Sequence, residues 1–87
     1  MTPGEYRVGL TFNPSGDDRV TQIKRAAAAL IDLIMSEPIS DGEADAQIYR
    51  AAEVTRLNRL AAEAIEAGAM WAVKAATKPV VDSVERW

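Results

Sequence analysis

The feature that most constrains this chain is a run of small residues at helical spacing, at Ala61, Ala64, Gly68, Ala72 and Ala75. Residues three and four apart share one face of a helix, so these positions form a shallow stripe that lets another helix approach closely. Glycine in mid-helix costs about 1 kcal/mol relative to alanine, and a close contact at Gly68 would offset that cost. The same stripe takes in Ile48, Ala52, Leu57, Leu60, Trp71 and Val73. The pattern predicts a long helix over about residues 43–77.

A second helix is predicted for about residues 17–35. Its apolar residues recur at three- and four-residue spacing, as on the buried face of an amphipathic helix: Val20, Ile23, Ala27, Leu30, Ile31 and Ile34. The turn at residues 13–16 precedes this helix, and a loop at 36–42 follows it. The predicted fold class is therefore mostly α, a long antiparallel helical hairpin. One domain spans residues 1–87, and residues 78–87 form its C-terminal tail.

Residues 6–12 alternate in character, with Tyr6, Val8, Leu10 and Phe12 on one side. This period of two is typical of a half-buried strand. One strand cannot form a sheet by itself, and an edge strand with an apolar face promotes association unless it is covered. The pattern predicts a short N-terminal strand that pairs between copies, and therefore a homo-oligomer.

The composition excludes several kinds of chemistry. The chain has 87 residues with no cysteine and no histidine, which excludes disulfides and thiolate metal sites and removes the commonest general base. A formal net charge of −3 argues against a dedicated binder of duplex DNA, although a few converging cations can still hold a small phosphorylated ligand. There is no secretory signal at the N-terminus and no apolar run near the ~20 residues that span a bilayer. We expect a cytosolic protein with no metal and no cofactor.

Three cations are candidate ligand-binding groups: Lys24, Arg56 and Lys74. Arg56 and Lys74 lie eighteen residues apart on the same predicted helix, so they share a face but are separated by about 27 Å along its axis. Within one chain they cannot grip one small ligand, whereas symmetry between copies could bring them to one. The alternative is that each is an ordinary solvated charge.

Two aromatic residues are read differently. Phe12 stands just before the Asn13-Pro14-Ser15-Gly16 turn, where its ring either stacks on a base or packs against the protein. Trp71, beside Met70, is expected in the core.

Acidic pairs leave a second function open. Glu63 with Glu66, and Asp82 with Glu85, are each spaced three apart. All-helical nucleotide pyrophosphohydrolases use two such pairs around magnesium, an ion that prefers oxygen ligands. Acids at this spacing are also common on exposed helix faces. A third possibility is a helical oligomerisation or scaffold module that binds no nucleotide.

Four segments together carry a family resemblance: Asn13-Pro14-Ser15-Gly16, Ile23-Lys24, Arg56, and the run from Ala69 through Met70-Trp71-Ala72-Val73-Lys74 to Thr77. In these segments the chain resembles the helical-hairpin domain of phage immune-evasion sponges, which oppose the CBASS and Thoeris defences. The resemblance covers about residues 6–79.

This resemblance implies a binding protein and not an enzyme. Members of the family bind cyclic nucleotide signals made by bacterial immune systems and hold them without cleavage. Their ligands are cyclic dinucleotides, cyclic trinucleotides or cyclic ADP-ribose isomers. Members assemble as homo-oligomers, often hexamers, with pockets between protomers, and they act in the cytoplasm of the infected bacterial host.

By position, the resemblance places Phe12, Asn13, Ser15 and Lys24 in a nucleotide pocket between protomers. It places Arg56 in a second pocket near a symmetry axis, and it includes Lys74 without a defined role. The chain departs from the family in two places. The short N-terminal strand lacks the earlier ribbon of longer anti-Thoeris members, which favours cyclic oligonucleotides over ligands of the ADP-ribose type. Ala26 stands where a hydroxyl would be useful beside Lys24, which argues against the second pocket.

Overall fold

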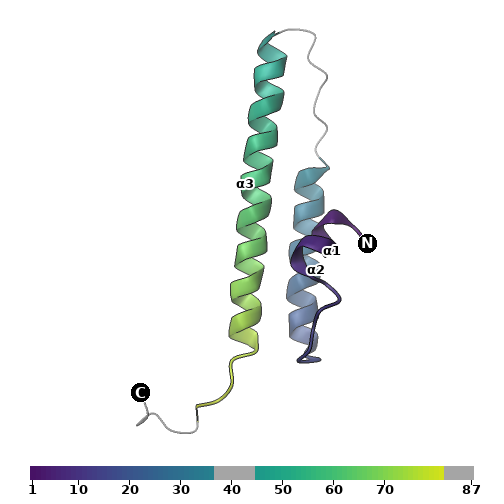
Figure 1. Cartoon of the computed structure of the whole chain (residues 1–87), viewed down its shortest axis with the longest axis vertical. Coiled ribbons are helices and arrows are strands. Elements are labelled where there is room, and N and C mark those ends of the chain that lie inside the picture. Colours follow the sequence, from purple (N-terminus) through teal and green to yellow (C-terminus); the bar gives the residue numbers. More distant parts are fainter. Residues whose placement is uncertain (37–44, 82–87) are drawn as a thin grey trace.

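The computed structural model describes residues 1–36 and 45–81, with the side chains of residues 45–47 left out. Three helices make up this part of the chain: α1 (Pro3–Val8), α2 (Asp18–Met35) and α3 (Asp45–Ala76). α2 and α3 run side by side in opposite directions, and α1 packs mainly on α2 (Figure 1). The predicted loop at 36–42 and the end of the predicted tail lie largely outside the described residues, whereas residues 78–81 are described and are not helical.

Local signals explain where α2 begins. Asp17 is the N-cap residue, and its side chain accepts a hydrogen bond from the Arg19 N–H at 2.8 Å. A capping side chain of this kind satisfies one of the amide groups that a helix start leaves without a partner. Gly16 precedes it with a φ of 66°, a left-handed conformation that glycine adopts without strain. The turn and the cap therefore set the direction in which α2 leaves the N-terminal segment.

The predicted N-terminal strand is wrong, because residues 3–8 form the helix α1. Thr2 and Glu5 make a capping box, with the Glu5 N–H donating to Thr2 Oγ1 at 3.1 Å and the Thr2 N–H donating to Glu5 Oε1 at 2.7 Å. Pro3 occupies the first turn, where its missing N–H costs nothing, and Gly9 ends the helix with a φ of 64°. The hydrogen bonds from the backbone and then the side chain of Thr2 lower the pKa of Glu5. These capping residues outweigh the alternation of residues 6–12.

α1 is held against α2 by one very close approach. The Gly4 N–H donates to Asp32 Oδ1 at 2.7 Å, and Gly4 is buried. A Cβ added at Gly4 would overlap the backbone carbonyl of Ala28 and come within 2.8 Å of Asp32 Oδ1. Only glycine fits this position without displacing α1.

Replacing Gly4 with alanine is therefore expected to lift α1 from α2. Because the obstacle is backbone, the cost should fall in the range of overpacking, about 1–3 kcal/mol. Amide hydrogen exchange of Tyr6 and Leu10, which donate to Thr2 and Glu5 carbonyls, should accelerate accordingly. Gly68→Ala is the matched control, because no atom lies within 4 Å of its added Cβ. Unchanged exchange in α1 of the Gly4→Ala protein would contradict this packing.

The core between α2 and α3 is small. The apolar residues buried in the described part of the chain are Val20 and Ile31 of α2, Ala62 of α3, and Ala28 of α2, which lies beneath Gly4 of α1. Half-buried small and branched residues of α3 extend it along the same side: Ala61, Ile65, Ala69, Ala72, Val73 and Ala76. Short side chains line this core as the sequence predicted, but only Ala61, Ala72 and Val73 of the predicted stripe contribute to it.

Much of the predicted apolar stripe of α3 faces away from α2. Leu57 and Leu60 are each 49% exposed, and Trp71 is 61% exposed, so the prediction that Trp71 is a core residue is wrong for the single chain. Ala64, Gly68 and Ala75 are exposed as well, and Gly68 has no close neighbour to offset its cost. Leu30 of α2, predicted in the buried face, is 45% exposed. α3 has two apolar faces. The face that packs against α2 is the one with more small residues, at positions 61, 62, 69 and 76.

Candidate functional site

Among the residues whose burial the structure describes, Lys24 is the most deeply buried charged residue, with 8% of its surface exposed. It lies on α2, and its ammonium reaches the segment that links α1 to α2. There Nζ donates to the carbonyl oxygen of Gly9 at 2.9 Å and to that of Phe12. The Phe12 ring centroid lies 5.6 Å from the same Nζ, while Phe12 as a whole residue is 71% exposed. A buried cation and an open aromatic face therefore stand side by side.

The turn after Phe12 is held by its own side chains. Asn13 Nδ2 donates to the Asp17 carbonyl at 2.9 Å and to Thr21 Oγ1 at 3.1 Å. Ser15 Oγ donates to Asn13 Oδ1 at 2.6 Å and accepts from the Asp17 N–H at 3.2 Å. Asn13 thus uses both of its donors and one acceptor within the protein. In this chain Asn13 and Ser15 shape the turn beside Phe12.

Two hollows meet at Lys24. One, here called the turn hollow, has a volume of about 210 Å³ and is lined by Phe12, Asn13, Pro14, Ser15, Val20, Lys24, Val73 and Thr77. The other, the α1–α3 groove, has a volume of about 410 Å³ and is lined by Arg7, Val8, Lys24, Glu63, Glu66, Ala67, Ala69, Met70 and Val73. Lys24 and Val73 line both hollows. The two spaces are therefore neighbours with a shared wall.

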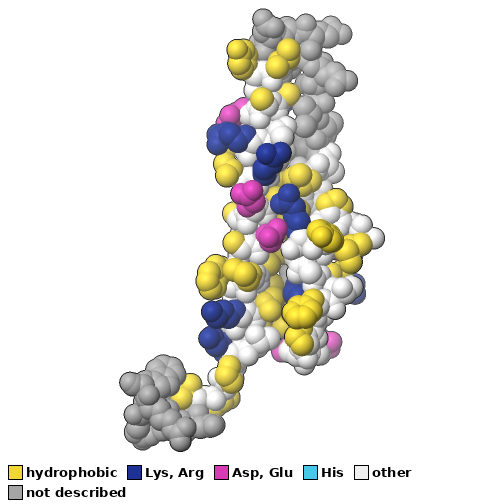
Figure 2. All heavy atoms as spheres, in the orientation of Figure 1, with side chains coloured by type: hydrophobic (Ala, Val, Ile, Leu, Met, Phe, Trp, Pro, Cys, Tyr) yellow, Lys and Arg dark blue, Asp and Glu magenta, His cyan; other side chains and the backbone are white. Residues whose placement is uncertain are grey.

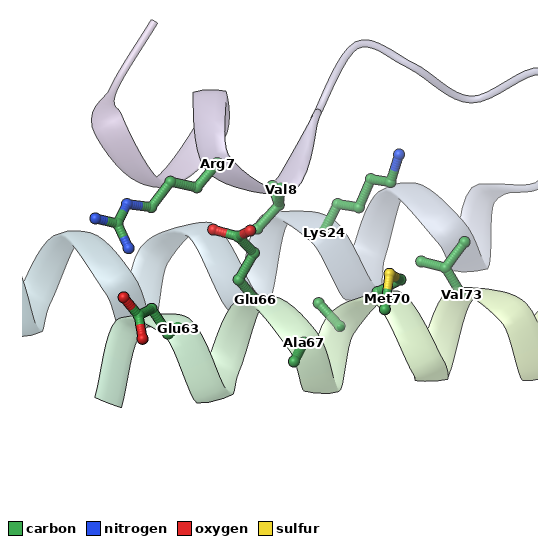
Figure 3. A pocket seen from close by; sticks show the side chains of 9 residues that line it. Arg7, Val8, Lys24, Glu63, Glu66, Ala67, Met70 and Val73 are labelled. Atoms are coloured by element: carbon green, nitrogen blue, oxygen red, sulfur yellow. The ribbon is translucent and has the colours of Figure 1, made fainter. Parts of the chain in front are cut away.

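Polar and apolar groups are segregated along the α1–α3 groove. Figure 3 shows the Arg7 guanidinium and the carboxylates of Glu63 and Glu66 gathered towards one end, with Met70 and Val73 towards the other. The Lys24 side chain points away from Met70 and α3, towards the N-terminal segment (Figure 3). The groove therefore offers an apolar surface bounded by charges of both signs.

Arg56 and Lys74 are placed elsewhere on α3. The Arg56 guanidinium bonds the Glu53 carboxylate, with Nε 3.2 Å from Oε2 and Nη2 on Oε1. This hydrogen bond lowers the pKa of Glu53 and raises that of Arg56. Lys74 Nζ lies 5.5 Å from the Trp71 ring centroid. Neither cation lines the turn hollow or the α1–α3 groove, so one chain does not unite the three predicted cations.

Comparison with known families decides what this hairpin is. The family described as the Acb2/Tad1 hairpin domain matches residues 5–77, a span that holds most of α1, all of α2 and α3, and both hollows. The chain belongs to the Acb2/Tad1 hairpin family. This is the anti-CBASS and anti-Thoeris sponge family that the sequence resembles. Searches of curated proteins and of solved structures found no match.

Some residues that line the two hollows of this Acb2/Tad1 hairpin domain were not expected from the sequence. Arg7, Met70 and Val73 line the groove or the turn hollow, and none was proposed as a site residue. The alternating pattern of residues 6–12 predicts Arg7 on the polar face of a strand, so its place on α1 beside the groove could not be foreseen from that pattern. Val73 was assigned to the packing stripe of α3. The Thr2-Pro3-Gly4-Glu5 capping signature is the sequence signal that would have found α1, and with it Arg7.

The structure describes one of the two acidic pairs of this hairpin domain. Glu63 and Glu66 lie on α3 at the groove, whereas Asp82 and Glu85 lie outside the described residues. Among the described residues no three acidic side chains gather closely enough to hold a metal ion. None of the helices described is both long and apolar enough to cross a membrane.

Proposed function

We propose that this protein binds cyclic nucleotide immune signals and sequesters them without cleavage. The observation that carries the proposal is the Lys24–Phe12 pair at the junction of two hollows, in a chain of the Acb2/Tad1 hairpin family. Phosphate oxygens favour charge-assisted hydrogen bonds from an ammonium, and an exposed aromatic ring offers a stacking surface for a base. The pair therefore matches the two chemical groups that every cyclic nucleotide presents.

The dimensions of the two hollows favour a ligand with more than one base. Small-molecule sites typically measure about 300–1,000 Å³, and the groove of about 410 Å³ adjoins the turn hollow of about 210 Å³. A phosphate near Lys24 would leave one base beside Phe12 and another over Met70. A cyclic dinucleotide fits this arrangement, with cyclic trinucleotides and cyclic ADP-ribose isomers as the other ligands that the family resemblance implies.

The proposal includes a homo-oligomer, for which a hexamer is the state implied by the resemblance. A chain this short buries only a modest fraction of its surface, and few side chains here are fully buried. Hydrophobic side chains lie open along α3 between charged ones (Figure 2). The exposed residues Leu57, Leu60, Ala64, Gly68, Trp71 and Ala75, here called the outer stripe, recur at helical spacing. Packing of outer stripes between copies would cover them, and closed symmetry would repeat each Arg56 around an axis.

Sequestration demands affinity and stoichiometry but no reaction. The whole sequence lacks histidine and cysteine, which carry much of enzymatic acid–base and nucleophilic chemistry. We propose a binding protein without cofactors that acts in the cytoplasm of an infected bacterial host.

Recovery of intact ligand tests the proposal. Purified protein incubated with cyclic di-AMP and cyclic tri-AMP should retain ligand in native mass spectrometry at a fixed number per assembly. Heat denaturation should then release the unchanged ligand, with or without magnesium. Glu63→Gln should behave like the wild-type protein in this respect. Turnover beyond one ligand per site, abolished by Glu63→Gln, would instead support the pyrophosphohydrolase alternative, and absence of any bound nucleotide would support the scaffold alternative.

A further inference from the structure

The hydrogen bonds of Lys24 limit what its ammonium can offer a ligand. An ammonium has three N–H donors, and two of them are spent on the carbonyls of Gly9 and Phe12. Among the described residues no carboxylate lies within ion-pair distance of Lys24, since the Arg56–Glu53 pair is the ion pair found there. The ammonium is thus hydrogen-bonded to two neutral carbonyl groups, which leaves one N–H donor for a ligand.

The segment that Lys24 holds has few other anchors. Between Gly9 and Phe12 its backbone bonds are local: the Leu10 N–H donates to Glu5 at 3.1 Å and the Phe12 N–H to Gly9 at 3.0 Å. The Gly9 carbonyl therefore receives both the Phe12 amide and the Lys24 ammonium. Removal of the Lys24 side chain would leave the Phe12 carbonyl without this hydrogen bond to α2. It would also remove the contact between the Phe12 ring and the Lys24 ammonium.

We propose that Lys24 is a positioning residue, which clamps the segment from Gly9 to Phe12 onto α2 and so sets the place of the Phe12 ring. It contributes no more than one direct hydrogen bond to a bound anion. The ligand part of this inference rests on the proposed function, whereas the clamp is a property of the protein alone. Loss of binding in a Lys24 variant therefore reports a displaced Phe12 as well as a lost charge.

Amide hydrogen exchange of the nucleotide-free protein tests the clamp. A hydrogen bond to a charged group contributes about 1.5–3 kcal/mol, which corresponds to about tenfold or more in an opening equilibrium. Lys24→Met keeps the length of the side chain and removes its donors, so the Leu10 and Phe12 amides should exchange about tenfold faster or more. Amides in the middle of α2 and α3 should keep their wild-type rates. Arg25→Met, the exposed neighbour, is the matched control and should change none of these rates.

Rescue and a wild-type measurement complete the test. Lys24→Arg retains donors for both carbonyls and should restore most of the protection lost in Lys24→Met. In the wild-type protein the Lys24 ammonium protons should exchange about tenfold or more slowly than those of Lys74, because Lys74 is exposed and also lies beside an aromatic ring. Wild-type amide exchange in Lys24→Met, or equally fast ammonium exchange at Lys24 and Lys74, would overturn the clamp. The ammonium exchange is measured in the wild-type protein, so it tests the clamp even if Lys24→Met does not fold.

Measurements of cyclic di-AMP affinity test whether Lys24 affects ligand binding through Phe12. If Lys24 acts through Phe12, the Lys24→Met and Phe12→Ala changes should not be additive, and the double variant should bind within about threefold of the weaker single variant. Full additivity would overturn the coupling. If the wild-type protein binds no cyclic nucleotide, the proposed function is refuted. The clamp is still tested by the hydrogen-exchange measurements, because they use the nucleotide-free protein.

Discussion

Trp71→Glu is expected to convert the assembled protein into monomers. Trp71 is 61% exposed in the single chain and lies on the outer stripe between Gly68 and Ala75. Tryptophans at protein interfaces are enriched among residues whose loss costs at least about 2 kcal/mol, or about thirtyfold in affinity per interface. A buried carboxylate would add a desolvation penalty. Because closed symmetry repeats the change in every copy, sedimentation velocity at micromolar concentration should show the monomer.

A control separates this effect from added charge alone. Gln22→Glu places one further carboxylate on an exposed position of α2, so it should sediment like the wild-type protein. Gly68→Leu, which fills the shallow part of the outer stripe, should weaken assembly in the same direction as Trp71→Glu. An unchanged assembly in Trp71→Glu would show that the outer stripe is not the interface between copies.

The two long helices could be predicted because their signal is repeated many times. Apolar residues at three- and four-residue spacing extend over several turns in both helices, so single exceptions do not erase the pattern. α2 begins at Asp18, one residue after its Asp17 cap, and α3 ends at Ala76. The short helix α1 has no such repetition, since its six residues depend on the caps at Thr2 and Gly9. Over six residues, the apolar pattern of a strand cannot be distinguished from that of a helix with fewer than two turns.

Which face of α3 is buried could not be predicted from one sequence. Small and apolar residues surround α3 on two sides, at Ala62 and Ala69 as well as at Gly68 and Trp71. Periodicity finds helical faces but does not say whether α2 or another copy covers each one. The structure assigns Ala62 to the core and leaves Trp71 exposed. A helix with apolar residues on two faces therefore misleads a prediction that assumes one buried face.

The sequence predicts that Phe12 and Lys24 lie together, but it does not predict their hydrogen bonds or the lining of the hollows by Arg7, Met70 and Val73. Phe12 and Lys24 were expected together, and the structure places the Lys24 ammonium 5.6 Å from the Phe12 ring. The burial of Lys24 depends on the path of the chain from α1 through Gly9, and that path follows from a helix that the sequence pattern did not reveal. The bonds of Asn13 to Thr21 and Asp17 likewise depend on how the turn meets α2. Such contacts arise from geometry between elements and leave no periodic signal.

Phe12→Ala and Arg56→Ala are expected to weaken the binding of two different ligand classes. Loss of an aromatic stacking partner costs about 1–3 kcal/mol per base, so Phe12→Ala should weaken the ligand class held at the turn hollow by about fivefold to over a hundredfold. Arg56→Ala should leave that class unchanged and weaken the second class tenfold or more, up to complete loss where symmetry repeats the change in one pocket. Both side chains are exposed, so neither change should unfold the protein.

The ion pair of Arg56 gives this prediction a sharper form. Glu53 occupies the Arg56 guanidinium in the nucleotide-free chain, so a phosphate must compete with a carboxylate for the same donors. Glu53→Gln removes that competing charge and should strengthen binding of the Arg56-dependent class, because exposed ion pairs add little stability of their own. Arg59→Ala, three residues further along α3 and exposed, is the control that should alter neither class. Titration calorimetry with cyclic di-AMP and cyclic tri-AMP measures all four variants, and equal weakening of both ligands by Phe12→Ala and by Arg56→Ala would contradict two separate pockets.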